Sequence, residues 1–345
     1  MSAFRATFVL ALAVAAAVPV ATPAYATADV TTRRLAGADR YATAAAIAST
    51  AFPTGAVRAI LASGDRFPDA LGAGYLAGTV AAPILLTSAA RLPAATEAAL
   101  AALGTTDVDV IGGDAVISPA VAARLVELGY TVRRLGGLDR YETSRVVAES
   151  VPATSVGALG SNGRTAIVAS GEDFADALAG SPMAYAQAFP VLLTPRMTLS
   201  SQASAALSSL GIAHVLVLGG DAAIAPRVVT AIEEAGITVT RLAGADRAAT
   251  ATAIADFEIG TLGWSGTGVS LSAGDGFADG LTGGPLGGVQ RTPLLLATSP
   301  TLLGTVTGSW LTSRNATIGA IDALGGVAAV AESTLTAAKQ AATTG

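Results

Sequence analysis

The sequence predicts an α/β protein built from three tandem copies of one domain-sized unit, each with a parallel sheet. The first observation is a repeat, because the segment Arg34–Tyr41 (Arg-Leu-Ala-Gly-Ala-Asp-Arg-Tyr) returns from Arg134 and again from Arg241. The second is that short, continuously apolar segments alternate with helical patterns inside each period, as in parallel α/β sheets. The third is the length of the period, which matches a small domain and exceeds the roughly 20–50 residues of solenoid repeats.

Three further motifs recur in the same order inside each period, which makes a chance match untenable. The third copy diverges, since Ala248, Ala297 and Val327 replace the tyrosine, threonine and aspartate of the other copies. We therefore expect repeats at 27–133, 134–240 and 241–345, which can close about a pseudo-threefold axis. The motifs are Ser63–Leu71, Ser170–Leu178 and Ala273–Leu281; Pro83–Thr87, Pro190–Thr194 and Pro293–Ala297; and Ile111–Asp114, Leu218–Asp221 and Leu324–Val327.

The first repeat shows the expected order of elements. Gly104 and Gly129 end two helices, as C-terminal glycines do. Ser118 and Pro119 begin another, with serine as the N-cap and proline at the first helical position. A strand at the end of the period stands between two repeats and could complete the sheet of either neighbour. The expected elements are a strand at 58–63, a helix at 70–79, a strand at 83–87, a helix at 93–103, a strand at 108–111, a helix from 119 to 129 and a strand at 130–135.

The N-terminus predicts export. Arg5 precedes the apolar run Ala6–Val20, and Ala24-Tyr25-Ala26 offers a cleavage site, with a second choice after Ala28. Residues 1–26 are therefore expected to be a signal peptide. No later segment is apolar enough to predict a transmembrane or sorting anchor. An exported chain without such an anchor is expected to diffuse away or to be held non-covalently.

Composition narrows the classes of function. The chain has no cysteine, so it has no disulfide framework and no thiolate metal site. Its net charge of −5 becomes −6 without Arg5, which disfavours nucleic acid as a partner. No metal or cofactor is expected.

No catalytic residue is expected either, because the chain lacks a Gly-x-Ser-x-Gly elbow, a Walker loop and a His-Glu-x-x-His helix. The lone His214 is interpreted as an incidental strand-edge residue. The alternative is a wall glycan hydrolase that uses paired carboxylates such as Asp65 with Asp69, or Glu172 with Asp176. Against it, the pair is triplicated, and nothing in the sequence puts one carboxylate in a distinctly more apolar place.

The recurring motifs also suggest where a ligand would bind. They follow predicted strands, so they should gather at the carboxyl edge of each sheet. Asp39 and Asp139 are expected to cap helices, and Asp69, Asp176 and Asp279 to lie in first helical turns, where the helix dipole stabilises them.

Two arginines flank the glycine-containing turn of each first motif, and a guanidinium can hold a carboxylate or phosphate with two hydrogen bonds. The competing interpretation is that these arginines fix loops or join repeats, and that the glycines only form tight turns. The predicted ligand-binding residues are Arg34, Arg40, Arg134, Arg140, Arg241, Arg247, Gly112, Gly113, Gly219 and Gly220.

These motifs resemble the cell wall-binding repeat 2 family of Gram-positive surface proteins, over about residues 34–330. The resemblance implies three Rossmann-like modules arranged as a pseudo-threefold trimer. It also implies non-covalent attachment to an anionic secondary wall polymer, teichoic-acid-like or similar. The location that this attachment implies is the cell wall or the cell surface, with a secreted fraction as the alternative. A surface-assembly module that binds other proteins is a further alternative. No residues remain for an effector domain, so an anchoring module alone is expected.

The same resemblance implicates one motif in attachment, although its apolar pattern predicts a buried strand that supports the fold. Its residues here are Pro83, Ile84, Leu85, Leu86, Pro190, Val191, Leu192, Leu193, Pro293, Leu294, Leu295 and Leu296.

Overall fold

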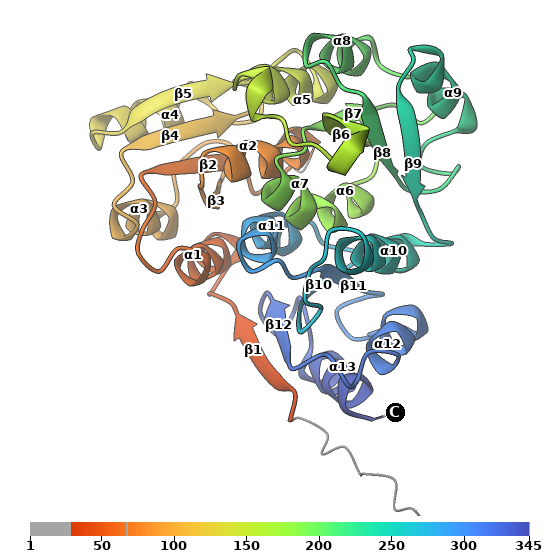
Figure 1. The fold of residues 1–345 in the computed structure, drawn as a ribbon. Helices are drawn as coiled ribbons and strands as arrows, with labels where there is room; N and C mark the ends of the chain where they lie inside the picture. The colour runs from red at the N-terminus through yellow and green to blue at the C-terminus, as the bar shows by residue number, and fades with distance from the viewer. Residues whose placement is uncertain (1–28, 67, 345) are drawn as a thin grey trace, which may run out of the picture.

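The described residues, 29–66 and 68–344 in a computed structural model, form three α/β modules around one centre (Figure 1). Each module has a four-stranded sheet in which every pairing is parallel, which confirms the predicted fold class. The sheet orders are β3-β2-β4-β5, β7-β6-β8-β9 and β1-β12-β10-β11. The strands are β1 (Thr31–Leu35), β2 (Arg58–Ser63), β3 (Ile84–Thr87), β4 (Asp107–Ile111), β5 (Thr131–Leu135), β6 (Thr165–Ser170), β7 (Val191–Thr194), β8 (His214–Leu218), β9 (Thr238–Leu242), β10 (Gly268–Ala273), β11 (Leu294–Ala297) and β12 (Ala320–Leu324).

The strand between two repeats belongs to the sheet that precedes it. β5 pairs with β4 and β9 pairs with β8, so each first motif starts on the last strand of the previous module. The third sheet takes this strand from the other end of the chain, because β1 pairs with β12 from Thr31↔Ala320 to Leu35↔Leu324. Figure 1 shows β1 beside β12 in the lowest module. The sheets are thus offset by one strand from the proposed sequence repeats 27–133, 134–240 and 241–345.

Helices cover both faces of the sheets. The predicted helix at 70–79 is two pieces, a 3₁₀ helix at Pro68–Gly72 followed by α2. Ser118 occupies the predicted N-cap position before Pro119, which confirms the prediction, although its hydroxyl makes no capping bond and has no partner among the described residues. The helices are α1 (Arg40–Ala51), α2 (Ala73–Thr79), α3 (Ala94–Ala102), α4 (Pro119–Glu127), α5 (Arg140–Glu149), α6 (Ala175–Ala179), α7 (Ser181–Gln187), α8 (Ser201–Ser209), α9 (Pro226–Glu234), α10 (Arg247–Gly260), α11 (Ala278–Gln290), α12 (Thr305–Thr312) and α13 (Glu332–Thr343).

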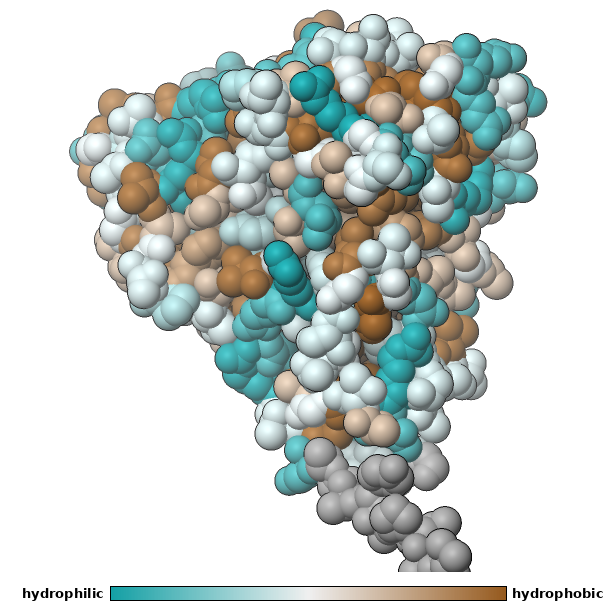
Figure 2. Space-filling model, viewed as in Figure 1, coloured by the Kyte–Doolittle hydropathy of each residue, from teal (hydrophilic) through white to brown (hydrophobic). Residues whose placement is uncertain are grey.

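Equivalent helices of the three modules, α2, α7 and α11, meet at the centre (Figure 1). Leu71, Leu178 and Leu281, one from each module, lie in a single buried cluster. Around it the packing is cyclic, because α1 lies on α11, α5 on the 3₁₀ helix and α10 on α6. Each module's first helix therefore packs on the module before it, which gives the pseudo-threefold arrangement. On the outer face shown in Figure 2, hydrophobic residues form small patches that hydrophilic residues separate.

The predicted signal peptide, residues 1–26, lies outside the described residues. Within the part of the chain that is described, no helix is both long and apolar enough to cross a membrane.

Candidate functional site: the interfaces between modules

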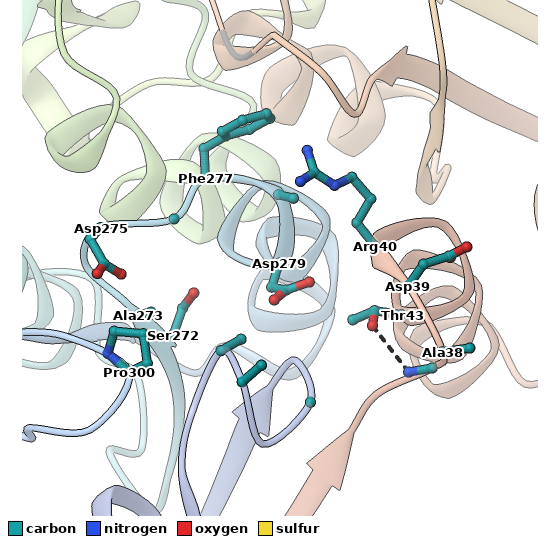
Figure 3. Close-up of a pocket in the computed structure, with 16 residues that line it drawn as sticks. Ala38, Asp39, Arg40, Thr43, Ser272, Ala273, Asp275, Phe277, Asp279 and Pro300 are labelled. Carbon is teal, nitrogen blue, oxygen red and sulfur yellow. Dashed lines mark hydrogen bonds between the residues drawn. The ribbon is translucent and has the colours of Figure 1, made fainter.

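The strand-end motifs gather where the carboxyl edge of one sheet meets the first helix of the next module. Between the second and third modules lies a cavity of about 420 Å³, the 2–3 pocket, lined by Glu172, Asp176, Gly220, Arg247 and Thr250 among others. Between the third and first modules lies an equivalent cavity of about 540 Å³, the 3–1 pocket. Its corresponding lining residues are Asp275, Asp279, Gly326, Arg40 and Thr43 (Figure 3). The expectation that these motifs converge is confirmed for both interfaces.

The first arginine of each copy holds the glycine turn of the sheet on which it lies. Arg34, Arg134 and Arg241 donate to the carbonyls of Gly325, Gly112 and Gly219 at 3.0, 2.8 and 2.6 Å. The same arginines form ion pairs with Glu332, Asp114 and Asp221 at 2.8, 3.2 and 3.5 Å. These partners engage several N–H donors of each guanidinium, which agrees with the interpretation that these arginines fix loops. A ligand contact by these three side chains stays a prediction.

The second arginine of each copy bonds the Ser-Gly turn of its own module. Arg40, Arg140 and Arg247 donate to the carbonyls of Gly64, Gly171 and Gly274. Arg247 has two further contacts, an ion pair with Asp173 at 3.2 Å and a place 5.5 Å from the Phe174 ring centroid. Arg40 and Arg140 have no carboxylate within ion-pair distance among the described residues.

Aspartates cap the helices that carry these second arginines. Asp39 accepts from the amides of Tyr41 and Ala42 at 3.0 and 2.8 Å, and Asp139 accepts from the Glu142 amide at 2.8 Å. The predicted caps are confirmed, and they place carboxylates on amides that an anion would otherwise use.

The first glycine of each Gly-Gly turn has a backbone conformation that favours glycine. Gly112, Gly219 and Gly325 have φ values of 110°, 101° and 102°. A Cβ on Gly219 would lie 2.3 Å from a carboxylate oxygen of Asp176. The turn therefore needs glycine both for its φ angle and for the approach of the aspartate. The second glycine lines the pockets at Gly220 and Gly326, and Gly113 is the equivalent residue of the first module.

The aspartates of the second motif lie in first helical turns, as predicted. Burial, and to a smaller degree the nearby Asp173, raise the pKa of Asp176 to about 6, while the Thr250 hydroxyl and Arg247 oppose the shift. Burial also raises the pKa of Asp279, with Arg40 opposing. Glu172 and Asp275 are exposed. The expectation that neither carboxylate of a pair lies in a more apolar place is therefore wrong, because the adjacent module covers only the second one.

One position that the sequence analysis passed over distinguishes the three interfaces. It holds Arg66 in the first module, Asp173 in the second and Gly276 in the third. Asp173 pairs with Arg247 across the 2–3 interface, so the residue at this position decides what the incoming arginine meets. The signal available from sequence was variation inside an otherwise repeated motif.

The apolar motif forms the edge strands β3, β7 and β11, and all twelve of its residues are buried. This burial confirms the prediction of a buried strand that supports the fold.

His214 begins β8, where it is 2% exposed and its Nε2 lies 3.0 Å from the Thr240 hydroxyl. Among the described residues, no group of three or more histidine or acidic side chains is placed to hold a metal ion.

The described residues thus form three related α/β modules with pockets at two of the interfaces between them. The family model of cell wall binding domain 2 (CWB2) matches residues 34–122, 134–229 and 241–335, one match for each repeat. The chain belongs to this family of cell wall-binding proteins.

Relatives and solved structures agree with that membership. The chain is 29% identical over 275 residues to N-acetylmuramoyl-L-alanine amidase LytC of Bacillus subtilis, covering 80% of this chain and 52% of the relative. It is 33% identical over 216 residues to the amidase enhancer of the same organism, covering 63% and 28%. It thus spans about half, or less, of the length of these relatives. Cwp6 and Cwp8 from Clostridium difficile share the fold, each at 24% identity and a TM-score of 0.78, covering 92% and 90% of this chain and 48% and 51% of theirs.

Proposed function

We propose that this protein attaches non-covalently to the bacterial cell wall by binding an anionic secondary wall polymer at its module interfaces, without catalysing a reaction. Family membership supports the cell wall as partner and a wall or surface location. Export through residues 1–26 and the anionic nature of the polymer are part of the proposal.

The interface between the first and second modules carries the argument for an anion. Arg66 is exposed there and Arg140 begins the incoming helix; neither has a carboxylate within ion-pair distance among the described residues. The equivalent interface of the next pair holds Asp173 and Arg247, which neutralise each other. A pair of unmatched guanidinium groups offers a planar donor set to phosphate or carboxylate, so this interface is the best anion site of the three.

Repetition would let weak contacts hold a polymer. One chain presents three related interfaces at fixed separations, and a polymer presents many copies of its unit. Simultaneous engagement can raise the overall affinity by about 10²–10⁴ over one contact. This is the advantage that a triplicated site offers to an anchor.

The test is retention of the protein on purified Gram-positive walls before and after chemical removal of anionic polymers. We expect retention on intact walls and its loss on stripped walls. Arg66→Gln should weaken retention about two- to fivefold, because one exposed charge contact contributes roughly 1 kcal/mol at most. Arg227→Gln is the matched control, since Arg227 is also exposed, has no ion pair among the described residues and lies on the outer helix α9.

Equal retention on intact and stripped walls would exclude an anionic ligand. Equal weakening by the two arginine variants would exclude the 1–2 interface as its site. Ordered self-association in the absence of walls would favour the surface-assembly alternative.

A second candidate, a wall hydrolase, rests on one observation. The raised pKa of Asp176, about 6, beside the exposed Glu172 resembles the division between a general acid and an ionised carboxylate. Release of soluble sugar or peptide from walls, abolished by Asp176→Asn together with Asp279→Asn, would establish it. Intact walls after prolonged incubation would leave binding as the function.

A further inference from the structure

The 3–1 pocket differs from its counterparts by three substitutions that the divergent third repeat carries. Ser272 replaces an alanine of the other repeats, Ala62 and Ala169. Gly280 likewise replaces Ala70 and Ala177, and Gly276 takes the variable position of the motif. Ser272 and Gly276 line the 3–1 pocket, the larger of the two described above, and Gly280 lies next to Ser272.

Ser272 is a buried hydroxyl that faces this pocket. Its residue is 2% exposed and lines the cavity, and its hydroxyl makes no hydrogen bond with any described residue. Figure 3 shows the side chain of Ser272 directed from its strand towards Asp279 and the cavity. The 2–3 pocket has a serine one position further along its strand, Ser170, whose hydroxyl accepts from the Glu172 amide at 3.1 Å. The Ser272 hydroxyl, by contrast, has no partner among the described residues and is open to the pocket, where a ligand can bond it.

The glycine at 280 keeps this hydroxyl accessible. A Cβ at Gly280 would lie 3.5 Å from the Ser272 hydroxyl oxygen and 3.3 Å from a Leu178 methyl carbon. The alanine of the other repeats would therefore cover one side of the hydroxyl. Ser272 and Gly280 stand where the other repeats have two alanines, so a hydroxyl takes the place of apolar methyl groups beside the pocket.

The charges around the pocket exclude a phosphate as its best ligand. Three aspartates, Asp39, Asp275 and Asp279, line it against the single cation Arg40. Asp39 already occupies the free amides of α1. Gly276 leaves Arg40 without the carboxylate that Asp173 supplies to Arg247. The pocket thus offers carboxylate acceptors, a guanidinium donor and a hydroxyl, the complement of a neutral compound rich in hydroxyl groups.

We infer that the 3–1 pocket binds a neutral sugar unit of the wall polymer. Sugar hydroxyls donate to Asp275 and Asp279 and accept from Arg40, the Ser272 hydroxyl completes the set, and Phe277 provides an apolar wall. A cavity of about 540 Å³ suits a small ligand. The inference rests on the proposed wall-binding function. It assigns the sugar to the 3–1 pocket and leaves the anionic group of the polymer to the interface between the first and second modules.

Saturation-transfer NMR and titration of the whole chain with single compounds test this assignment. The probes are N-acetylglucosamine and glucose as neutral sugars, and inorganic phosphate and glycerol phosphate as anions. We expect a neutral sugar to bind with a Kd on the order of 1 mM, a strength typical of so small a ligand. Ser272→Ala and Gly280→Ala should each weaken that binding about fivefold or more, through loss or covering of one buried hydrogen-bonding group.

Two matched variants separate this effect from damage to the fold. Ser270→Ala changes a serine of the same strand that is also buried but does not line the pocket, and Gly308→Ala adds a methyl group to a helix remote from it. Both should bind the sugar as the unchanged chain does. Gly280→Ala should keep or raise the melting temperature, since alanine favours a helix over glycine, so its loss of sugar would not reflect unfolding.

Absence of sugar binding, binding of the anions alone, or sugar binding unchanged in both pocket variants overturns the inference. If such a result accompanies normal retention on walls, the proposed function stands and only the pocket assignment fails. Sugar binding that depends on Ser272, without retention on walls, supports the pocket and rejects the wall-anchor function.

Discussion

Asp176 is a carboxylate that one module contributes and the next module partly covers. It lies in the first turn of α6, against the Gly219 turn of its own sheet and beside Thr250 of α10. Desolvation favours its protonated form, so its pKa rises from 3.8 to about 6. Folding therefore becomes less favourable as the pH rises from the unfolded pKa through the folded one.

Asp176→Asn should accordingly stabilise the protein at pH 8. The gain is on the order of 3 kcal/mol, because a shift of one pH unit corresponds to about 1.4 kcal/mol. As the pH falls below 3.8, Asp176 becomes protonated in both states, so the gain should shrink towards zero. Thermal unfolding between pH 3.5 and 8 measures the gain. The control is Asp221→Asn, because Asp221 is an exposed aspartate that pairs with Arg241. A gain that is equal at pH 4 and pH 8 would contradict the assignment to ionisation.

The six arginines of the first motif were predictable as residues, but their capacity to bind a ligand was not. The sequence predicts two per turn, and the structure finds all six in the described part bonded to backbone carbonyls. Which of them keeps capacity for a ligand depends on a residue from another module, such as Asp173 opposite Arg247. No local pattern contains that information.

The central helices α2, α7 and α11 owe their contact to small residues. A Cβ on Gly78 of α2 would lie 2.1 Å from the carbonyl oxygen of Tyr185, and one on Gly284 of α11 would lie 2.0 Å from the Ser181 hydroxyl oxygen. Backbone thus meets backbone at the centre, where a larger side chain would separate the modules.

Gly78→Ala should therefore destabilise the protein by about 1–3 kcal/mol, the usual effect of overpacking. Gly308→Ala in α12 is the control, because its Cβ would lie at an ordinary 3.6 Å from Leu303, and it should gain up to about 1 kcal/mol. Urea unfolding compares the two. Equal stability of both variants would show that the central helices can move apart without cost.

At the scale of the whole molecule, β1 closes the ring of modules. It completes the third sheet through β12, buries Val30 and Leu35, and pairs Arg33 with Asp322 at 2.6 Å. The chain then continues into α1 of the first module, so the N-terminal strand is covalently part of the first module's chain segment and non-covalently paired with the last module.

Deletion of residues 29–35 should expose the edge of β12 and leave Asp322 without Arg33. Hydrogen exchange should rise markedly in β12 and β10, and much less in β6 and β8 of the second module. Addition of a peptide of residues 29–36 should restore part of the protection. Uniform exchange across all three sheets after the deletion would instead show that the modules unfold as one unit.

The sequence by itself determined the local features of this protein. Repeated motifs, apolar runs and turn residues predicted three α/β units, most strand positions, the aspartate caps and the burial of the apolar motif, because each depends on neighbours along the chain. Only the tertiary structure decided which sheet receives the strand between repeats, which aspartate is buried and where the third repeat places Ser272. Each of these depends on contacts between residues from different modules, and most of all on the pairing of β1 with β12 across nearly the whole chain.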